Sequence, residues 1–403
     1  MESAGKRLVL DVGRPLWADS GEHVPLPPVP GLEHGDDPSL LGVIISHSHL
    51  DHYGLLDQVS CQVPLYTGKT SAKLLKEAAF FSPAGIDRKW TGYLSDREPF
   101  EVGPFTVTPY LVDHSAFDAY ALLVEADGKR LFYSGDLRGH GLQSETFERL
   151  LNSPPRSVNT LLLEGTRVGT NGRDGRSSVD EAALEQEFAK VFRETEGLVL
   201  VACSAQNIDR LQTIYRATLN SRSAPRPRRL VIDPYVEAMA RATNNAEVPR
   251  AGLPGVQVYV PQNQRVKIKQ AGEFDRVNKI RNQRLFPRNL REQSKSLVLL
   301  FRPSMMKELE RAKCLEGAHL VWSMWPGYLE EGRMGHFLDL LSRYGTKLTV
   351  IHASGHASVS DLEALSRAMN ADRVVPIHTS APSKFPVHFK RTEIHRDGHW
   401  WPV

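Results

Sequence analysis

The chain has 403 residues, 41% of them hydrophobic and 24% charged, with a formal net charge of +3, which is typical of a folded globular protein with room for two domains and excludes a disordered chain. No apolar run is long enough to cross a bilayer and residues 1–13 lack a secretory signal, so we expect a cytoplasmic protein without a membrane partner. The three cysteines lie far apart in the sequence, which excludes a disulfide framework and a thiolate zinc site.

Apolar runs bounded by glycine, proline or polar turn residues predict strands along much of the chain. In chain order these runs are residues 8–13, 41–46, 105–112, 120–126, 130–136, 159–165, 198–204, 228–233, 296–302, 319–324, 348–354 and 374–380. Apolar residues at helical spacing predict helices at 178–195 and 358–371, the second capped by Ser358 or Ser360. Strands that alternate with helices predict the α/β class.

Basic charge is concentrated in one middle segment of the chain. Residues 222–295 contain 16 Lys or Arg against 6 Asp or Glu, which leaves the rest of the chain with a net charge of −7. Proline and apolar residues interrupt the basic runs, so we expect part of a folded domain and not a disordered tail. Such an excess is typical of proteins that bind a phosphate backbone, and a merely solvated surface is the alternative.

The stretch "IISHSHLDHYG", residues 44–54, places three histidines and an aspartate directly after an apolar run. His47 and His49 are two residues apart, so on an extended segment they face the same way, while Asp51 and His52 can turn toward a second ion. Histidine and carboxylate ligands suit zinc, and a site without thiolates is typical of a catalytic centre that leaves a position for water. This stretch therefore predicts the beginning of two metal sites.

Two metal sites need more ligands, and polar residues at other strand ends can supply them. His114 follows the run 105–112, Asp136 follows 130–135, and His378 follows 374–377. Because an α/β scaffold places its functional residues at strand ends, we expect these side chains to complete the sites.

With these residues the sequence resembles the metallo-β-lactamase superfamily. The resemblance implies that His47, His49 and His114 hold one zinc ion, that Asp51, His52 and His378 hold a second, and that Asp136 bridges them. Manganese or another divalent ion is the alternative to zinc. The implied fold is an αββα sandwich.

Three further stretches resemble motifs A, B and C of the β-CASP nucleases, a branch that includes ribonuclease J and the cleavage and polyadenylation endonuclease. They are "LLLEGT" with Glu164, "HASGHAS" with His356, and "PIHT" with His378. The resemblance implies an α/β β-CASP domain inserted between motifs A and B, where the basic segment also lies. We expect a discontinuous metallo-β-lactamase domain at 1–196 and 345–403, and the inserted domain at 197–344.

The resemblance implies a zinc-dependent hydrolase of phosphodiester bonds in single-stranded RNA, with a hydroxide activated by two metals and 5′-phosphate products. Asp51, Glu164 and His356 are the expected catalytic residues, with Asp51 as proton acceptor and His356, hydrogen-bonded to Glu164, acting on the phosphate or the leaving oxygen. Histidine at position 378 favours RNA, because the DNA-repair branch has valine there. A DNA nuclease of the same fold and a non-catalytic subunit of a processing complex are the alternatives. Exonuclease or endonuclease action and homo-oligomer formation stay open.

The substrate-binding residues are predicted from position and charge. Ser354 and Gly355 precede His356, and Ser204 or Asn207 follows a strand where a helix N-terminus could receive a phosphate, although an ordinary helix cap is the alternative. The expected set is Ser354, Gly355, Ser204, Arg281, Arg284 and Arg288. One departure from the family is that its usual first strand is missing or replaced before residue 6.

Overall fold

The computed structural model describes residues 1–15, 18, 22–82, 85–169, 180–221, 227–330 and 335–403. The chain divides into two compact units, residues 1–173 with 355–403, and residues 174–354. These limits differ from the predicted boundaries at 196/197 and 344/345. Helix α4 (Glu181–Glu194) belongs to the second unit, where Glu181 forms a buried ion pair of 3.0 Å with Arg210 of helix α5 (Ile208–Asn220).

The first sheet of the first unit has the strand order β1-β2-β3-β4-β5. Its strands are β1 (Glu2–Ser3), β2 (Lys6–Leu10), β3 (Leu40–Ile44), β4 (Leu65–Gly68) and β5 (Gly92–Leu94). Strand β1 pairs antiparallel with β2, and the other pairs are parallel. The family's usual first strand was predicted to be missing or replaced, and the two-residue strand β1 precedes β2 here.

The second sheet of the first unit has the order β18-β10-β9-β8-β7-β6. In chain order its strands are β6 (Phe100–Val102), β7 (Phe105–Val112), β8 (Ala119–Ala126), β9 (Lys129–Tyr133), β10 (Thr160–Glu164) and β18 (Arg373–Ile377). Strands β7 and β9 both run antiparallel to β8, and β10 and β18 run parallel to β9. Consequently β7, β9, β10 and β18 end at the same edge of the sheet.

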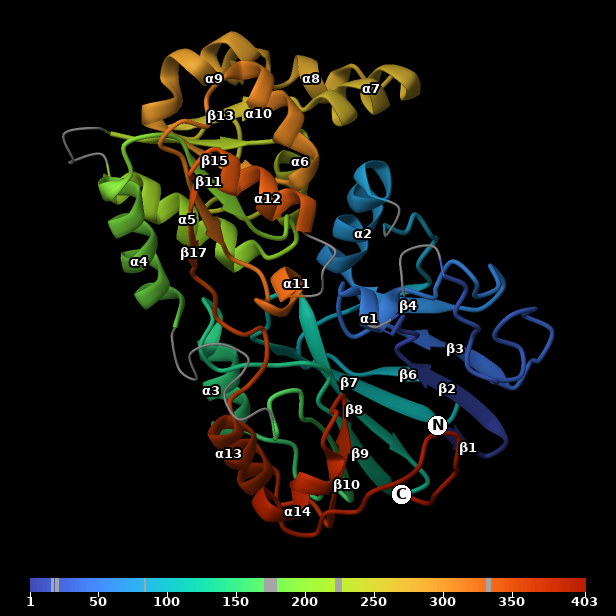
Figure 1. The fold of residues 1–403 in the computed structure, drawn as a ribbon. Coiled ribbons are helices and arrows are strands. Elements are labelled where there is room, and N and C mark those ends of the chain that lie inside the picture. The colour runs from blue at the N-terminus through green and yellow to red at the C-terminus, as the bar shows by residue number, and fades with distance from the viewer. Residues whose placement is uncertain (16–17, 19–21, 83–84, 170–179, 222–226, 331–334) are drawn as a thin grey trace. The chain divides into compact units, whose positions relative to one another are not determined.

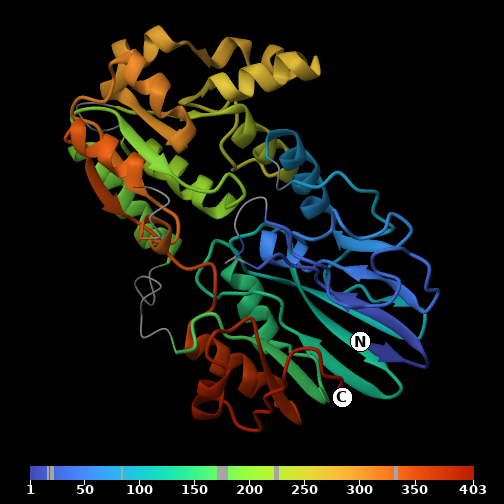
Figure 2. The ribbon, with the colours of Figure 1, turned by 45° about the vertical axis from the view of Figure 1, so that its right-hand side comes forward.

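In the first unit the two sheets lie between layers of helices (Figures 1 and 2). Side chains that alternate along the strands form the contacts between these layers. Ile44 of the first sheet and Leu122 of the second lie in one buried cluster between the sheets, whereas Leu123 faces the helices beyond the second sheet. Those helices are α3 (Ser144–Asn152), α13 (Val359–Met369) and α14 (Phe385–His388), and α1 (Leu50–Tyr53) and α2 (Lys69–Phe81) pack on the first sheet. The predicted αββα sandwich is confirmed.

The second unit is built on a parallel sheet with the order β14-β13-β12-β15-β11-β16-β17. Its strands are β11 (Val199–Ala202), β12 (Arg229–Ile232), β13 (Val256–Tyr259), β14 (Arg284–Leu285), β15 (Leu297–Phe301), β16 (His319–Trp322) and β17 (Lys347–Val350). Leu200 belongs to the buried cluster on one face of the sheet, and its fully buried neighbours Val199 and Val201 point to the other. Burial on both faces is typical of parallel sheets.

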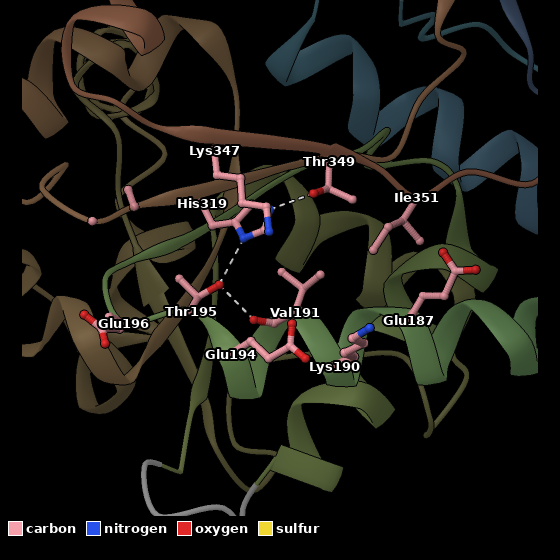
Figure 3. Close-up of a pocket in the computed structure, with 12 residues that line it drawn as sticks. Glu187, Lys190, Val191, Glu194, Thr195, Glu196, His319, Lys347, Thr349 and Ile351 are labelled. Carbon is pink, nitrogen blue, oxygen red and sulfur yellow. Dashed lines mark hydrogen bonds between the residues drawn. The ribbon is translucent and has the colours of Figure 1, made fainter.

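Helices cover the sheet of the second unit and cluster at one end of it (Figure 1). Besides α4 and α5 they are α6 (Pro234–Thr243), α7 (Gln262–Ala271), α8 (Asp275–Asn278), α9 (Pro287–Gln293), α10 (Met306–Ala312), α11 (Gly327–Glu330) and α12 (Gly335–Arg343). Figure 3 shows a cavity of about 610 Å³ beside α4, into which His319 and Thr195 point. Both ring nitrogens of His319 have hydroxyl partners, Thr195 Oγ1 at 3.2 Å and Thr349 Oγ1 at 2.8 Å.

Both predicted helices begin at a side-chain cap. Of the two candidate serines, Ser358 caps α13 and forms a capping box with Asp361. Asp180 caps α4, and the predicted start of that helix at 178–179 lies outside the described residues, as do residues 222–226 of the basic segment. Among the described residues, no helix is long and apolar enough to cross a membrane.

Candidate metal centre

Strand ends bring the predicted ligands of the first unit together. His47 and His49 lie in the loop after β3, and α1, which follows at once, contains Asp51 and His52. The other ligands follow β7, β9 and β18, whose ends share one edge of the second sheet: His114, Asp136 and His378. The structure therefore gathers all seven predicted ligand residues in the first unit.

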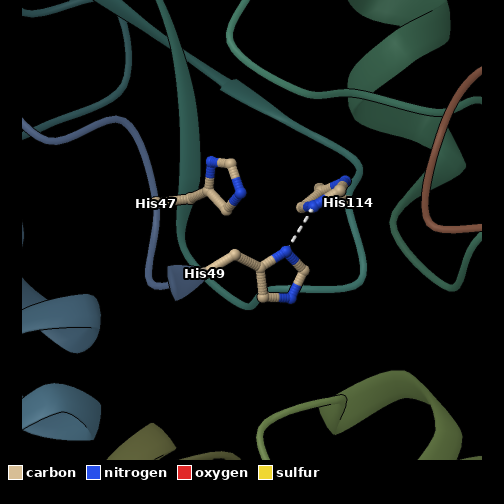
Figure 4. Close-up of side chains that lie close together, drawn as sticks. All are labelled: His47, His49 and His114. Carbon is tan, nitrogen blue, oxygen red and sulfur yellow. Dashed lines mark hydrogen bonds between the residues drawn. The ribbon is translucent and has the colours of Figure 1, made fainter. Parts of the chain in front are cut away.

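His47, His49 and His114 form the first cluster (Figure 4). One ring nitrogen of each lies within 4.8 Å of the others, and His114 Nε2 is 3.1 Å from His49 Nδ1. Burial holds the pKa values of His47 and His114 well below the ordinary value, and it lowers the pKa of His49 to about 4. The three rings are therefore neutral near pH 7, which is the form that binds a metal ion.

The second cluster contains two carboxylates and two histidines, Asp51, His52, Asp136 and His378. His52 Nε2 lies 3.1 Å from Asp136 Oδ2, and His378 Nε2 lies 3.0 Å from Asp51 Oδ2. Burial opposes protonation of His52, but Asp136 and Asp11 outweigh it and raise the pKa of this ring well above its ordinary value. Two anionic side chains that attract protons onto their neighbours also attract a metal cation.

Asp136 faces both clusters, because its Oδ2 also lies 3.8 Å from His47 Nε2. His47 Nε2 and Asp136 Oδ1 are buried and have no hydrogen-bond partner among the described residues, although buried polar atoms are normally paired. A donor set of imidazoles and carboxylates without thiolate suits zinc or a similar divalent ion. The residues present therefore fit a pair of divalent ions that share Asp136.

Asp11 orients one of these histidines and was missed by the sequence analysis. Its carboxylate lies 2.6 Å from His52 Nδ1 and accepts hydrogen bonds from Ser46 N–H at 2.6 Å and from the Tyr133 hydroxyl at 2.6 Å. This contact fixes which nitrogen of His52 faces Asp136. A signal was present in the sequence, because Asp11 follows an apolar strand as the predicted ligands do.

We expect Asp11→Asn to weaken binding of one divalent ion by about 10- to 100-fold, the usual effect of losing a carboxylate that orients a ligand histidine. Asparagine tolerates the positive φ of 59° at this position, so the fold should persist. Zinc titration followed by calorimetry measures the effect. Asp37→Asn is the control, because Asp37 forms an ion pair with Arg7 elsewhere on the first sheet. Equal zinc affinity in Asp11→Asn and the parent would contradict the orienting role.

Glu164 and His356 lie beside both clusters. His356 Nδ1 is 3.6 Å from Glu164 Oε1 and 3.7 Å from Asp136 Oδ2, and its ring centroid is 5.4 Å from that of His378. At 3.6 Å the contact between His356 and Glu164 is an ion pair, longer than the predicted hydrogen bond. The carboxylate of Glu164 also accepts the backbone N–H groups of Ala357 and Thr166. Burial lowers the pKa of His356, but the carboxylates of Asp136 and Glu164 outweigh burial and raise this pKa to about 9.

Thr166 is a second contact that the sequence analysis did not identify. Its Oγ1 lies 2.7 Å from His378 Nδ1, which leaves His378 Nε2 to face Asp51. His378 itself has a positive φ of 48°, an uncommon backbone conformation that the surrounding structure must maintain. The residue after "EG" in motif A therefore orients the histidine of motif C.

The predicted substrate-binding residues are divided between the units. Gly355 belongs to the first unit, where an added Cβ would lie 2.6 Å from Ser115 Oγ, so a larger residue beside His114 would require Ser115 to move. Ser354 is buried in the second unit. Ser204 is exposed there and accepts the N–H of Gln206, while Asn207 is an ordinary cap of α5. Arg281, Arg284 and Arg288 also lie in the second unit, not among the ligands.

The comparison with known families agrees with this geometry. Residues 16–194 match the beta-lactamase superfamily domain. A solved structure of a protein of unknown function from Enterococcus faecalis has the same fold, with a TM-score of 0.70 and 21% identity over 88% of this chain and 79% of that one. Residues 16–194 therefore contain a domain of the beta-lactamase superfamily.

Curated relatives indicate the branch within that superfamily. The chain is 22% identical to ribonuclease J of Mycoplasma genitalium, over 87% of this chain and 60% of the relative. It is also 22% identical to ribonuclease J of Mycobacterium tuberculosis, over 94% and 65%, so it spans less than two thirds of either relative. These similarities and the inserted α/β unit support the β-CASP, ribonuclease J-like branch.

Proposed function

We propose that the protein is a zinc-dependent nuclease that hydrolyses phosphodiester bonds of single-stranded RNA and leaves 5′-phosphate products. The observation that carries this proposal is the pair of ligand clusters that share Asp136, with His356 facing the same carboxylate. When bound there, two divalent ions supply Lewis acidity, a water of lowered pKa and neutralisation of charge developing on the phosphate.

The protein's own residues contribute proton transfer and orientation. The Asp51 carboxylate, 3.0 Å from His378 Nε2, is the acceptor for the proton of the attacking water. His356 donates a proton to the leaving 3′ oxygen or a hydrogen bond to a phosphate oxygen. Glu164 supports the charged form of His356 from 3.6 Å. Bond cleavage on the 3′-oxygen side leaves the phosphate on the downstream fragment.

RNA is the favoured substrate because the curated relatives are ribonucleases and because His378 occupies motif C. Single strands are favoured over duplexes because a duplex would hide the scissile linkage. A DNA nuclease of the same fold is the second candidate. A non-catalytic subunit is disfavoured, because such proteins are expected to lose ligand residues and all seven are gathered here.

Cleavage of matched oligonucleotides tests the proposal. Purified protein with measured metal content is incubated with labelled RNA and DNA of one sequence, each with a 5′-phosphate or a 5′-hydroxyl. We expect RNA to be cut to fragments with 5′-phosphates, and a chelator to abolish cutting. Preferential cutting of DNA would support the second candidate, and cleavage undiminished in chelator would contradict the metal-dependent mechanism.

A further inference from the structure

A second cavity of about 770 Å³ lies in the second unit. Its wall contains five cationic side chains, Arg265, Arg288, Arg291, Arg311 and Lys313, and we call it the basic cavity. The cavity of Figure 3 differs from it in charge, because glutamates and lysines both line that one and its histidine already has two partners. Of the three arginines predicted to bind substrate, only Arg288 lines the basic cavity.

The fold holds the cations of the basic cavity at fixed positions. Leu290 of α9 and Leu309 of α10 lie in the same buried cluster, which packs the two helices together. Arg288 and Arg291 are three residues apart on α9, so they share one face of that helix. Lys313 is the left-handed C-cap of α10, and Arg265 comes from α7.

The two carboxylates of the wall offset only part of the charge of the five cations. Glu308 accepts the Tyr259 hydroxyl at 2.6 Å and the Gln262 N–H at 2.8 Å, and Glu292 is the other carboxylate of the lining. Within the described part of the chain, none of the five cations forms an ion pair. Five unpaired cations around one hollow generate a positive potential that attracts a polyanion.

We propose that the basic cavity binds the phosphate backbone of an RNA strand, as an anchoring site in addition to the metal centre. The inference rests on the proposed function. Backbone binding fits better than a nucleotide site, because the only aromatic residue in the lining, Tyr259, has a buried ring and an occupied hydroxyl. The lining therefore offers no exposed aromatic ring on which a base could stack, whereas exposed guanidinium groups are suited to phosphate oxygens.

The test compares two charge-matched triple variants. One replaces Arg288, Arg291 and Arg311 by Ala, and the control replaces Lys269, Lys279 and Lys295, which are exposed and outside the lining. Anisotropy of labelled single-stranded RNA is measured in chelator at several salt concentrations. For single strands, each phosphate contact contributes about 0.7 to the slope of the logarithm of the binding constant against the logarithm of the salt concentration. The first variant should therefore lower the magnitude of this slope by about 2 and weaken RNA binding by at least about tenfold. The control should differ little from the parent.

Parallel measurements separate this inference from the proposed function. Hydrolysis of a small phosphodiester ester should be the same in both triple variants, because the metal centre is untouched. Equal loss of RNA binding in both variants would overturn the basic cavity as a site, even if the parent cleaves RNA. Cavity-dependent RNA binding without cleavage by the parent would instead overturn only the nuclease proposal. If the parent binds AMP tightly and the first variant does not, the basic cavity is a nucleotide site and backbone anchoring is overturned. If the parent does not bind RNA, backbone anchoring is overturned as well.

Discussion

Asp136→Ala should lose nearly all turnover on RNA. This effect is larger than the loss of about 10- to 100-fold that is usual when a residue orienting a metal ligand is replaced. The Asp136 carboxylate lies 3.1 Å from His52 Nε2 and 3.8 Å from His47 Nε2. Its removal therefore takes away a side chain that the two ligand clusters share. Burial opposes ionisation of Asp136, but His52 and His356 hold its pKa well below the ordinary value. The variant therefore loses the anionic side chain that faces both sites.

Metal content is measured beside turnover for Asp136→Ala. We expect the parent to contain close to two zinc-class ions per chain and the variant to contain fewer, with circular dichroism unchanged. Asp36→Ala, which removes an exposed carboxylate of the same unit, is the control and should keep both ions. A parent that holds no metal and stays active in chelator would rule out the dinuclear site.

His356→Ala should keep both metal ions and lose about 10² to 10⁴ in rate, the usual contribution of a positioned proton donor. His378→Ala should lose the second ion as well, because His378 contacts Asp51 within the second cluster. The two histidines lie close together, with ring centroids 5.4 Å apart, so the comparison separates proton donation from metal binding at nearly the same place.

Single-turnover cleavage and elemental analysis of both variants test this difference. His356→Gln is a useful companion, because it keeps a hydrogen-bond donor but cannot transfer a proton. If His356→Ala cleaves RNA at the parental rate, motif B is only a structural turn. If it loses metal as His378→Ala does, His356 is a ligand and not a proton donor.

Long apolar runs made most strands predictable from the sequence. Each predicted run overlaps a strand of the structure, for example β7 at Phe105–Val112 and β11 at Val199–Ala202. The sequence analysis missed β1, β4, β5, β6, β13 and β14, which have two to four residues each. So short a segment shows no clear alternation, and it becomes a strand only because a neighbouring strand pairs with it.

Local chemistry in the sequence determined which side chains were candidates for the site. The stretch from His47 to His52 and the polar residues that end apolar runs were sufficient to select them. The orienting contacts were not predictable in this way. Asp11 reaches His52 across 41 positions and Thr166 reaches His378 across 212, so neither pair can be recognised from local spacing.

Only the tertiary structure decided which strand ends meet. Because β7 and β9 both run antiparallel to β8, and β10 and β18 run parallel to β9, four distant segments end at one edge, and Asp136 comes to face both clusters. Packing likewise decided that Arg288 lines the basic cavity with Arg311, whereas Arg284 lies over the ring of Phe286. Sequence determines the donor and charge of each side chain, but the pairing order of strands and the packing of helices determine which of them share a site.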